Sequence, residues 1–203
     1  MSGYLSLNNR KKLNLLMLSD VLAAISGVEG VRRTLIVSSD KKVLRMARTM
    51  GADAVPEEGD FGVNLAVKTG ISVAAREGVC SVLVLPSDIP LISPVDVRSI
   101  ISLQITGCIV ITPSARFDGT NALLMNPPEV ISTFYDQQSF YSHTRMAISK
   151  HAKVAIYLSR NIMLDIDSRE DLEELSLTDS KCESAQFCRQ LCGESILNGW
   201  RSR

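Results

Sequence analysis

Segments with helical spacing and segments with strand character alternate along most of this 203-residue chain. Residues 9–25 carry apolar side chains three and four positions apart, which predicts a helix. Residues 33–38 form a short β-branched run, which predicts a strand. The alternation continues as far as a predicted helix over 168–177. It favours a three-layer α/β/α fold, in which helices cover both faces of a mostly parallel sheet.

The other predicted elements continue the alternation. Further helices are expected over 41–50, 61–76, from Ser93-Pro94 onwards, 127–134 and 139–151. Further strands are expected over 52–55, 81–86, 107–112, 121–125 and 154–158. The run 81–86 is continuously apolar, which is typical of a central strand buried on both faces.

Length and charge limit the class of protein. A chain of this size is large enough for one domain with a sizeable core, which we place at residues 1–177. Residues 178–203 form a tail that can add one helix. Lys and Arg total 22, as do Asp and Glu, so no net field favours nucleic acid or an anionic membrane. Without a signal peptide or a membrane-length apolar run, we expect a cytoplasmic protein that binds neither nucleic acid nor membrane.

Five cysteines allow two interpretations. Cys188 and Cys192 are four residues apart and would share a helix face, which is one requirement of a metal site. However, no histidine lies nearby to complete such a site, and an odd number of cysteines argues against a disulfide framework. We therefore expect reduced, structural thiols.

Three carboxylates follow apolar segments that we expect to be strands. Asp88 comes after the strand 81–86, and Asp165 and Asp167 come after the apolar Asn161–Leu164. Ligands of open α/β sheets bind outside the carboxyl ends of strands, where these residues could share a divalent cation such as Mg²⁺. That arrangement points to phosphoryl or nucleotidyl transfer. Asp88 is equally compatible with a turn, and Asp167 or Ser168 could cap the following helix.

Four motifs occur in a characteristic order: LPSDIPL, ARFDGTNALLM, QQSFYSH and LDIDSREDL. Together they make residues 1–177 resemble the 2-phospho-L-lactate guanylyltransferases of coenzyme F-420 biosynthesis. That family lies within the nucleotidyltransferases with a glycosyltransferase-A-like sheet. LPSDIPL is shared widely, whereas GTNALL, SFxxH and D-x-D before a helix are specific in combination. The resemblance implies a homodimeric enzyme that transfers guanylyl from GTP to 2-phospho-L-lactate, or in some relatives to phosphoenolpyruvate, with release of diphosphate.

The resemblance also implies metal-binding and catalytic residues. Asp88, Asp165 and Asp167 match the aspartates that hold the metal, expected to be Mg²⁺. Charge on the α-phosphate would be stabilised there, and the acceptor phosphate would be oriented for in-line attack.

Substrate contacts follow from the same comparison. Thr120 and Asn121 match the loop that binds the acceptor, and Ser139 matches a residue near a helix start that contacts the acceptor carboxylate. Asn64 matches a segment near the nucleotide. Arg116 is a candidate phosphate partner on residue type alone, and a surface arginine is the alternative.

Two residues of the third motif need separate interpretation. His143 lies four residues after Ser139 on the same helix face, and we favour a structural role with a backbone partner over contact with substrate. Asp136 stands where relatives usually have glycine. Its carboxylate would repel that of the acceptor unless the loop turns it outward or a metal offsets it.

Relatives begin with a β-strand and a basic loop resembling P-Y-K…K-S-R-L, which surrounds the nucleotide phosphates. This sequence starts at Met1-Ser-Gly-Tyr-Leu-Ser, so we expect the sheet to lack its first strand. Either the start lies further upstream, which we favour because the metal and acceptor motifs are intact, or the chain is a non-catalytic binding or scaffold homologue. Another nucleotidyltransferase, of the molybdenum-cofactor type, is the alternative enzyme.

Overall fold

The computed structural model describes residues 4–197, so Trp200 of the tail lies outside the described residues. The strands are β1 (Leu35–Ser38), β2 (Asp53–Pro56), β3 (Val82–Val84), β4 (Cys108–Pro113), β5 (Thr120–Asn126) and β6 (Lys153–Ile156). The helices are α1 (Leu7–Ile25), α2 (Lys41–Thr49), α3 (Val63–Arg76), α4 (Pro94–Ser102), α5 (Ser139–Ser149), α6 (Arg160–Met163), α7 (Arg169–Leu177) and α8 (Glu183–Leu197). No helix within this range is both long and apolar enough to cross a membrane.

The strands form two sheets. β1 and β2 make a parallel pair, and the other four lie in the order β3-β5-β4-β6. β5 is antiparallel to both of its neighbours, whereas β4 and β6 are parallel. The prediction of a mostly parallel, mixed sheet is therefore confirmed, with β5 as the reversed strand.

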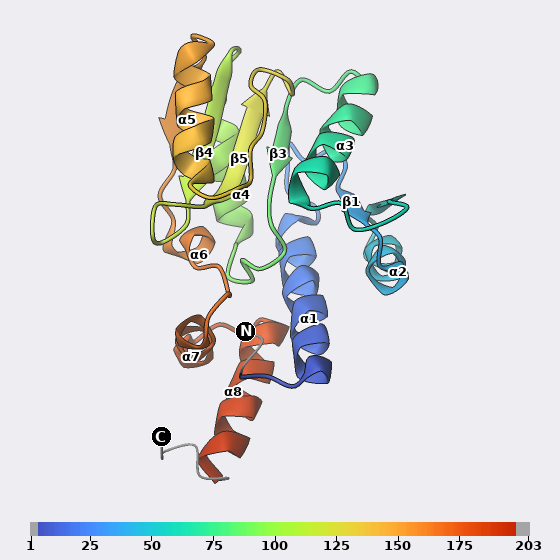
Figure 1. Ribbon diagram of the computed structural model, residues 1–203, viewed down its shortest axis with the longest axis vertical. Helices are drawn as coiled ribbons and strands as arrows, with labels where there is room; N and C mark the ends of the chain where they lie inside the picture. Colours follow the sequence, from blue (N-terminus) through green and yellow to red (C-terminus); the bar gives the residue numbers. More distant parts are fainter. Residues whose placement is uncertain (1–3, 198–203) are drawn as a thin grey trace.

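Alternating side chains of the central strands build a core on each face of the larger sheet. Cys108 and Val110 of β4 pack in a cluster with residues of α1, α2 and α4. Ile109 and Ile111 point to the opposite face and pack with residues of α3 and α5. Figure 1 shows α5 in front of the sheet and α4 behind it, which confirms the three-layer α/β/α arrangement.

One strand differs from its prediction. The run 81–86 was expected to be central and buried on both faces, but β3 is three residues long, partly exposed and at the edge of the four-stranded sheet. β1 is likewise an edge strand of the two-stranded sheet, and α3 contacts both β1 and β3. Within residues 4–197 no strand joins β1 to β3, in line with a sheet that lacks its first strand. Burial of β3 was overestimated because its apolar sequence does not reveal whether a neighbour is present.

Two further local predictions were wrong. Residues 127–134 form turns rather than a helix, because Pro128 lacks an N–H and disfavours helical backbone at Pro127. The segment before Asp165 is the short helix α6 and not a strand. The helix after Ser93-Pro94 was predicted correctly, and it begins with a capping box between Ser93 and Asp96.

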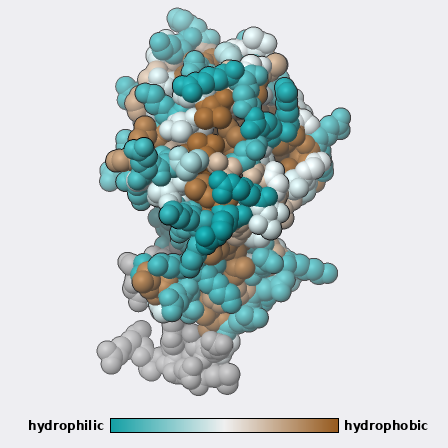
Figure 2. All heavy atoms as spheres, turned by 90° about the vertical axis from the view of Figure 1, so that its right-hand side faces the viewer, coloured by the Kyte–Doolittle hydropathy of each residue, from teal (hydrophilic) through white to brown (hydrophobic). Residues whose placement is uncertain are grey.

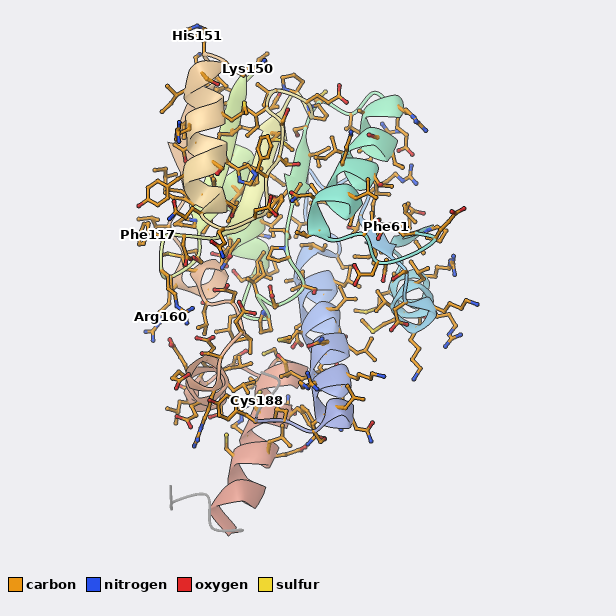
Figure 3. All side chains as sticks on the ribbon, in the orientation of Figure 1. Phe61, Phe117, Lys150, His151, Arg160 and Cys188 are labelled. Carbon is orange, nitrogen blue, oxygen red and sulfur yellow. The ribbon has the colours of Figure 1, made fainter. Side chains whose placement is uncertain are left out.

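A smaller helical cluster lies below the sheet, where α7 and α8 pack beside the lower half of α1 (Figure 1). The tail is therefore helical over Glu183–Leu197. The buried Asp20 carboxylate of α1 accepts hydrogen bonds from the backbone N–H groups of Glu183 and Ser184, at 2.8 and 2.9 Å, and so caps α8. Cys188, labelled in Figure 3, is a buried free thiol in this cluster, and burial raises its pKa to about 12.

Asp96, part of the capping box at the start of α4, also binds the segment that follows β6. Its carboxylate accepts hydrogen bonds from the backbone N–H of Ser93, the hydroxyls of Tyr157 and Ser159, and the amide of Asn161, at 2.6–3.3 Å. Burial alone would raise the pKa of Asp96, but these hydrogen bonds outweigh burial and lower the pKa. The charged carboxylate is therefore the stabilising form.

We expect Asp96→Ala to lower the free energy of unfolding by about 2–4 kcal/mol, because it leaves several partly buried donors without an acceptor. Urea titration at pH 7 measures this loss. Because folding lowers the pKa, the stabilisation is present above pH about 4 and is lost as the pH falls below that value, so the two proteins should converge there. Glu129→Gln, an exposed acidic residue, is the control and should change little. Equal stability of Asp96→Ala and the wild type at pH 7 would contradict this account.

Candidate active site

Two segments that carry the carboxylates of the first and fourth motifs meet below the four-stranded sheet. Asp88 follows β3, and Asp165 and Asp167 follow α6. The backbone N–H of Ile166 donates to the carbonyl of Asp88 at 2.9 Å, which fixes the two segments side by side. Residues separated by more than seventy positions in the sequence thus share one edge of the sheet.

The carboxylates influence one another electrostatically. Burial, followed by the charges of Asp167 and Asp165, raises the pKa of Asp88 to about 6. Burial is also the main cause of the raised pKa of Asp165, to which Asp167 contributes, while a hydrogen bond from Asn121 acts in the opposite direction. One buried oxygen of Asp88, Oδ1, has no hydrogen-bond partner among the described residues. A cation would relieve both this unsatisfied oxygen and the repulsion.

The chemistry of these residues fits Mg²⁺, since all three offer carboxylate oxygens. Within residues 4–197, no three His, Cys, Asp or Glu side chains are placed so that they could together hold a metal ion. Mg²⁺ keeps several waters and usually takes one or two carboxylates together with substrate phosphates, so it does not need a preformed protein cage. The site is therefore suited to an ion that arrives with a nucleotide.

Ser168 is the residue that caps α7. Its hydroxyl accepts a hydrogen bond from the backbone N–H of Asp171, and the Asp171 carboxylate accepts from the N–H groups of Ser168 and Asp167. The interpretation of Asp167 as the helix cap is therefore wrong. The pattern Ser-x-x-Asp before a helix marks this capping box in the sequence, and it also identifies Asp171, which the sequence analysis did not single out.

Asn121 holds the segment that carries Asp165. Its buried amide donates to the carbonyls of Ile162 and Met163, at 2.9 and 3.3 Å, in addition to its hydrogen bond with Asp165. These contacts fix the end of α6 against β5. The structure thus shows an anchoring role for a residue that the sequence assigned to the acceptor.

Thr120, Ser139 and His143 form a buried polar cluster beside Asn121. Ser139 Oγ donates to Thr120 Oγ1 at 3.1 Å, and Thr120 Oγ1 lies 3.0 Å from His143 Nδ1. The other ring nitrogen of His143 accepts a hydrogen bond from the backbone N–H of Phe134 at 2.9 Å, which is the expected backbone partner. Burial lowers the pKa of His143 to about 4, so the ring is neutral at pH 7.

The loop before α5 is tied to α3. Asn64 Oδ1 accepts from the backbone N–H of Tyr135 at 2.7 Å, and Asn64 Nδ2 donates to the exposed carboxylate of Asp136 at 3.1 Å. Asp136 therefore lies at the surface and is paired with an amide. Asn64 links the segment expected near the nucleotide to the loop expected near the acceptor.

Arg116 lies on the exposed loop between β4 and β5. The hydroxyl of Ser114 is the main cause of the lowered pKa of Asp118 in this loop, and the charge of Arg116 contributes. At the start of α7, burial opposes the lowered pKa of Asp171, hydrogen bonds from Ser168 and Asp167 cause it, and the charge of Arg116 adds to it. Figure 3 shows the exposed Phe117 on this loop and the exposed Phe61, before α3, on the opposite side of the molecule.

The side of the molecule that carries α2 and α3 is shown in Figure 2, where hydrophobic atoms remain visible among hydrophilic ones. Phe61, Val63 and Leu65, at and before the start of α3, are exposed. α3 begins without a side-chain cap, at Gly62. The sequence analysis did not identify these exposed apolar residues, because they fit the apolar periodicity of a helix.

Known proteins support the likeness seen in the motifs. Residues 1–196 match the family described as "Guanylyl transferase CofC like". A phosphoenolpyruvate guanylyltransferase of Rubrobacter xylanophilus is 40% identical over 82% of this chain and 80% of its own length. A 2-phospho-L-lactate guanylyltransferase of Methanothermobacter thermautotrophicus is 33% identical over 94% of this chain and 83% of its own length.

Solved structures support the fold alone. A nucleotidyl transferase from Methanothermobacter thermautotrophicus superimposes with a TM-score of 0.65 at 16% identity, over 86% of this chain and 81% of that protein. The family match spans both carboxylate segments and the buried polar cluster. The chain therefore belongs to the family of CofC-like guanylyl transferases.

Proposed function

We propose that this protein transfers the guanylyl group of GTP to 2-phospho-L-lactate or phosphoenolpyruvate, as a step in coenzyme F-420 biosynthesis. A phosphate oxygen of the acceptor attacks the α-phosphorus of GTP, the bond to the β-phosphate oxygen breaks, and diphosphate leaves. The names of the relatives support both acceptors. The observation that carries the proposal is the buried, unpartnered oxygen of Asp88 beside Asp165 and Asp167.

Asp88, Asp165 and Asp167 are the residues that would hold Mg²⁺. When bound, the ion neutralises charge that develops on the phosphates. The protein's own groups then position the reactants, which is most of what phosphoryl transfer demands. Asn121 keeps the Asp165 segment in place, and the backbone bond at Ile166 keeps Asp88 beside it.

Binding of the acceptor anion is assigned to Thr120 and Ser139 at the start of α5. Hydroxyl donors and helix N–H groups suit a carboxylate or phosphate without a buried cation. Arg116 is proposed as a phosphate partner at the rim, and Asn64 is proposed on the nucleotide side. The family match does not favour the molybdenum-cofactor or scaffold alternatives, and the homodimer stays a prediction.

Asp88→Asn should lower the rate of diphosphate release from GTP at least a hundredfold, because an amide is a weaker ligand for Mg²⁺ than a carboxylate. Thermal unfolding gives a measurement that does not depend on turnover. We expect Mg²⁺ with GTP to raise the melting temperature of the wild type but not that of Asp88→Asn. Glu129→Gln serves again as the exposed control and should respond like the wild type. An unchanged response of Asp88→Asn to Mg²⁺ and GTP would exclude Asp88 as a metal ligand.

Ser139→Ala should raise the KM for the acceptor by roughly tenfold to a hundredfold, since hydrogen bonds to charged groups are worth about 1.5–3 kcal/mol. The KM for GTP should stay nearly constant, because the nucleotide is placed on the Asn64 side of the metal. Steady-state kinetics with each substrate varied in turn makes this measurement. Ser142→Ala is the matched control, the same substitution one turn further along α5. Equal losses for both substrates would mean that Ser139 is only a structural residue.

A further inference from the structure

His143 is fully buried between β5 and the loop before α5, and each of its ring nitrogens has one partner. The Tyr135 ring packs against it edge-on, with centroids 4.9 Å apart. Both polar atoms of the buried ring are therefore satisfied, as buried polar groups generally are. The direction of each contact can be deduced from the chemistry of the groups.

The contact with Phe134 determines the tautomer of the ring. A backbone N–H can only donate, so Nε2 of His143 must accept with its lone pair. The buried ring is neutral at pH 7 and carries one proton, which must therefore be on Nδ1. Nδ1–H consequently donates to Thr120 Oγ1, 3.0 Å away.

This tautomer controls the hydroxyl pair. Thr120 and Ser139 have one O–H each, and the hydrogen bond between them uses one of the two. Thr120 Oγ1 accepts a hydrogen bond from His143, so Thr120 does not use its own O–H on the ring. The O–H that is not used between Thr120 and Ser139 can therefore donate to a group outside the pair. With the opposite tautomer, Thr120 would donate to Nδ1 and Ser139 to Thr120, and no O–H would remain.

The pair lies where such a donor is useful. Thr120 precedes Asn121, which holds the segment of Asp165, and Ser139 begins α5. The backbone N–H of Phe140 donates to the carbonyl of Asp118 at 3.2 Å, so this helix start is fixed against the loop that precedes β5. No acceptor for the remaining O–H contacts the pair within the described part of the chain.

We propose that His143 is a positioning residue that sets the direction of the protons in the Thr120–Ser139 pair, so that the pair donates a hydrogen bond to an anionic group of the acceptor. The proposal rests on the proposed function, because it needs an acceptor with a carboxylate or phosphate. It assigns to His143 a part in acceptor recognition without direct contact with the substrate.

Two substitutions separate the two ring contacts. The amide nitrogen of Asn can reach the position of Nδ1, whereas the amide oxygen of Gln can reach that of Nε2. His143→Asn can therefore keep the donor to Thr120, and His143→Gln can keep the acceptor for Phe134. We expect the KM for phosphoenolpyruvate or 2-phospho-L-lactate to stay within about threefold of wild type in His143→Asn. In His143→Gln it should rise about tenfold or more, with the KM for GTP unchanged in both variants.

The reverse order of the two variants would overturn the proposal, because His143 would then act only by holding the loop at Phe134. Equal losses in both variants would overturn it too. Thr120→Val, which removes the hydroxyl but keeps the shape, should match His143→Gln in its effect on the acceptor KM. Thermal unfolding of each variant shows whether it is folded.

The tautomer can be measured in the wild-type protein without turnover. The chain has two histidines, and His151 is exposed at the far end of α5 (Figure 3). Multiple-bond ¹H–¹⁵N spectra at pH 7, with His151→Gln used for assignment, should show a protonated Nδ1 and an unprotonated Nε2 for His143. A protonated Nε2 would overturn the proposal. A protonated Nδ1 in a protein that releases no diphosphate with GTP and either acceptor would refute the proposed function and support the proton arrangement.

Discussion

The candidate site depends on the hydrogen bonds that fix residues 159–166 in place. This segment contains only the four-residue helix α6, too short to be stable alone. Asp96 accepts hydrogen bonds from Ser159 and Asn161 at its beginning. The amide of Asn121 donates hydrogen bonds to the carbonyls at the end of α6, and the backbone carbonyl of Asp88 accepts a hydrogen bond from the N–H of Ile166. Polar contacts from three other parts of the chain thus place Asp165 and Asp167.

The site separates two kinds of charge. The carboxylates after β3 and after α6 repel one another, and burial, together with this repulsion, raises the pKa of Asp88. The proposed acceptor side uses neutral donors instead, the Thr120–Ser139 pair and the neutral His143. In the proposed function, the carboxylate cluster would hold a cation and the hydroxyl cluster would donate to the acceptor, so the two clusters would serve two phosphate-bearing substrates.

The errors of the sequence analysis share a cause. An apolar run such as 81–86 shows that a strand is present, but its burial depends on what lies beside it, and β3 is an edge strand. Residues 127–134 have helical apolar spacing, but the paired prolines prevent a helix. For Asn121, which its motif assigned to the acceptor, the structure adds a contact between its amide and the end of α6 that the motif does not reveal. The spacing of residue types along the chain indicates a local preference for helix or strand. It does not indicate which distant residues each element contacts.

The sequence alone determined most of the order of helices and strands, the three-layer architecture and the family, because periodicity, capping residues and motifs are local properties. It also identified Asp88, Asp165 and Asp167 as candidates. Only the tertiary structure decided that Ile166 joins the two carboxylate segments, that Asp136 faces outward on Asn64, and that Phe134 holds the ring of His143. Each of these contacts links residues from different elements or loops. Their energies depend on direction and distance, which a linear pattern of residue types does not contain.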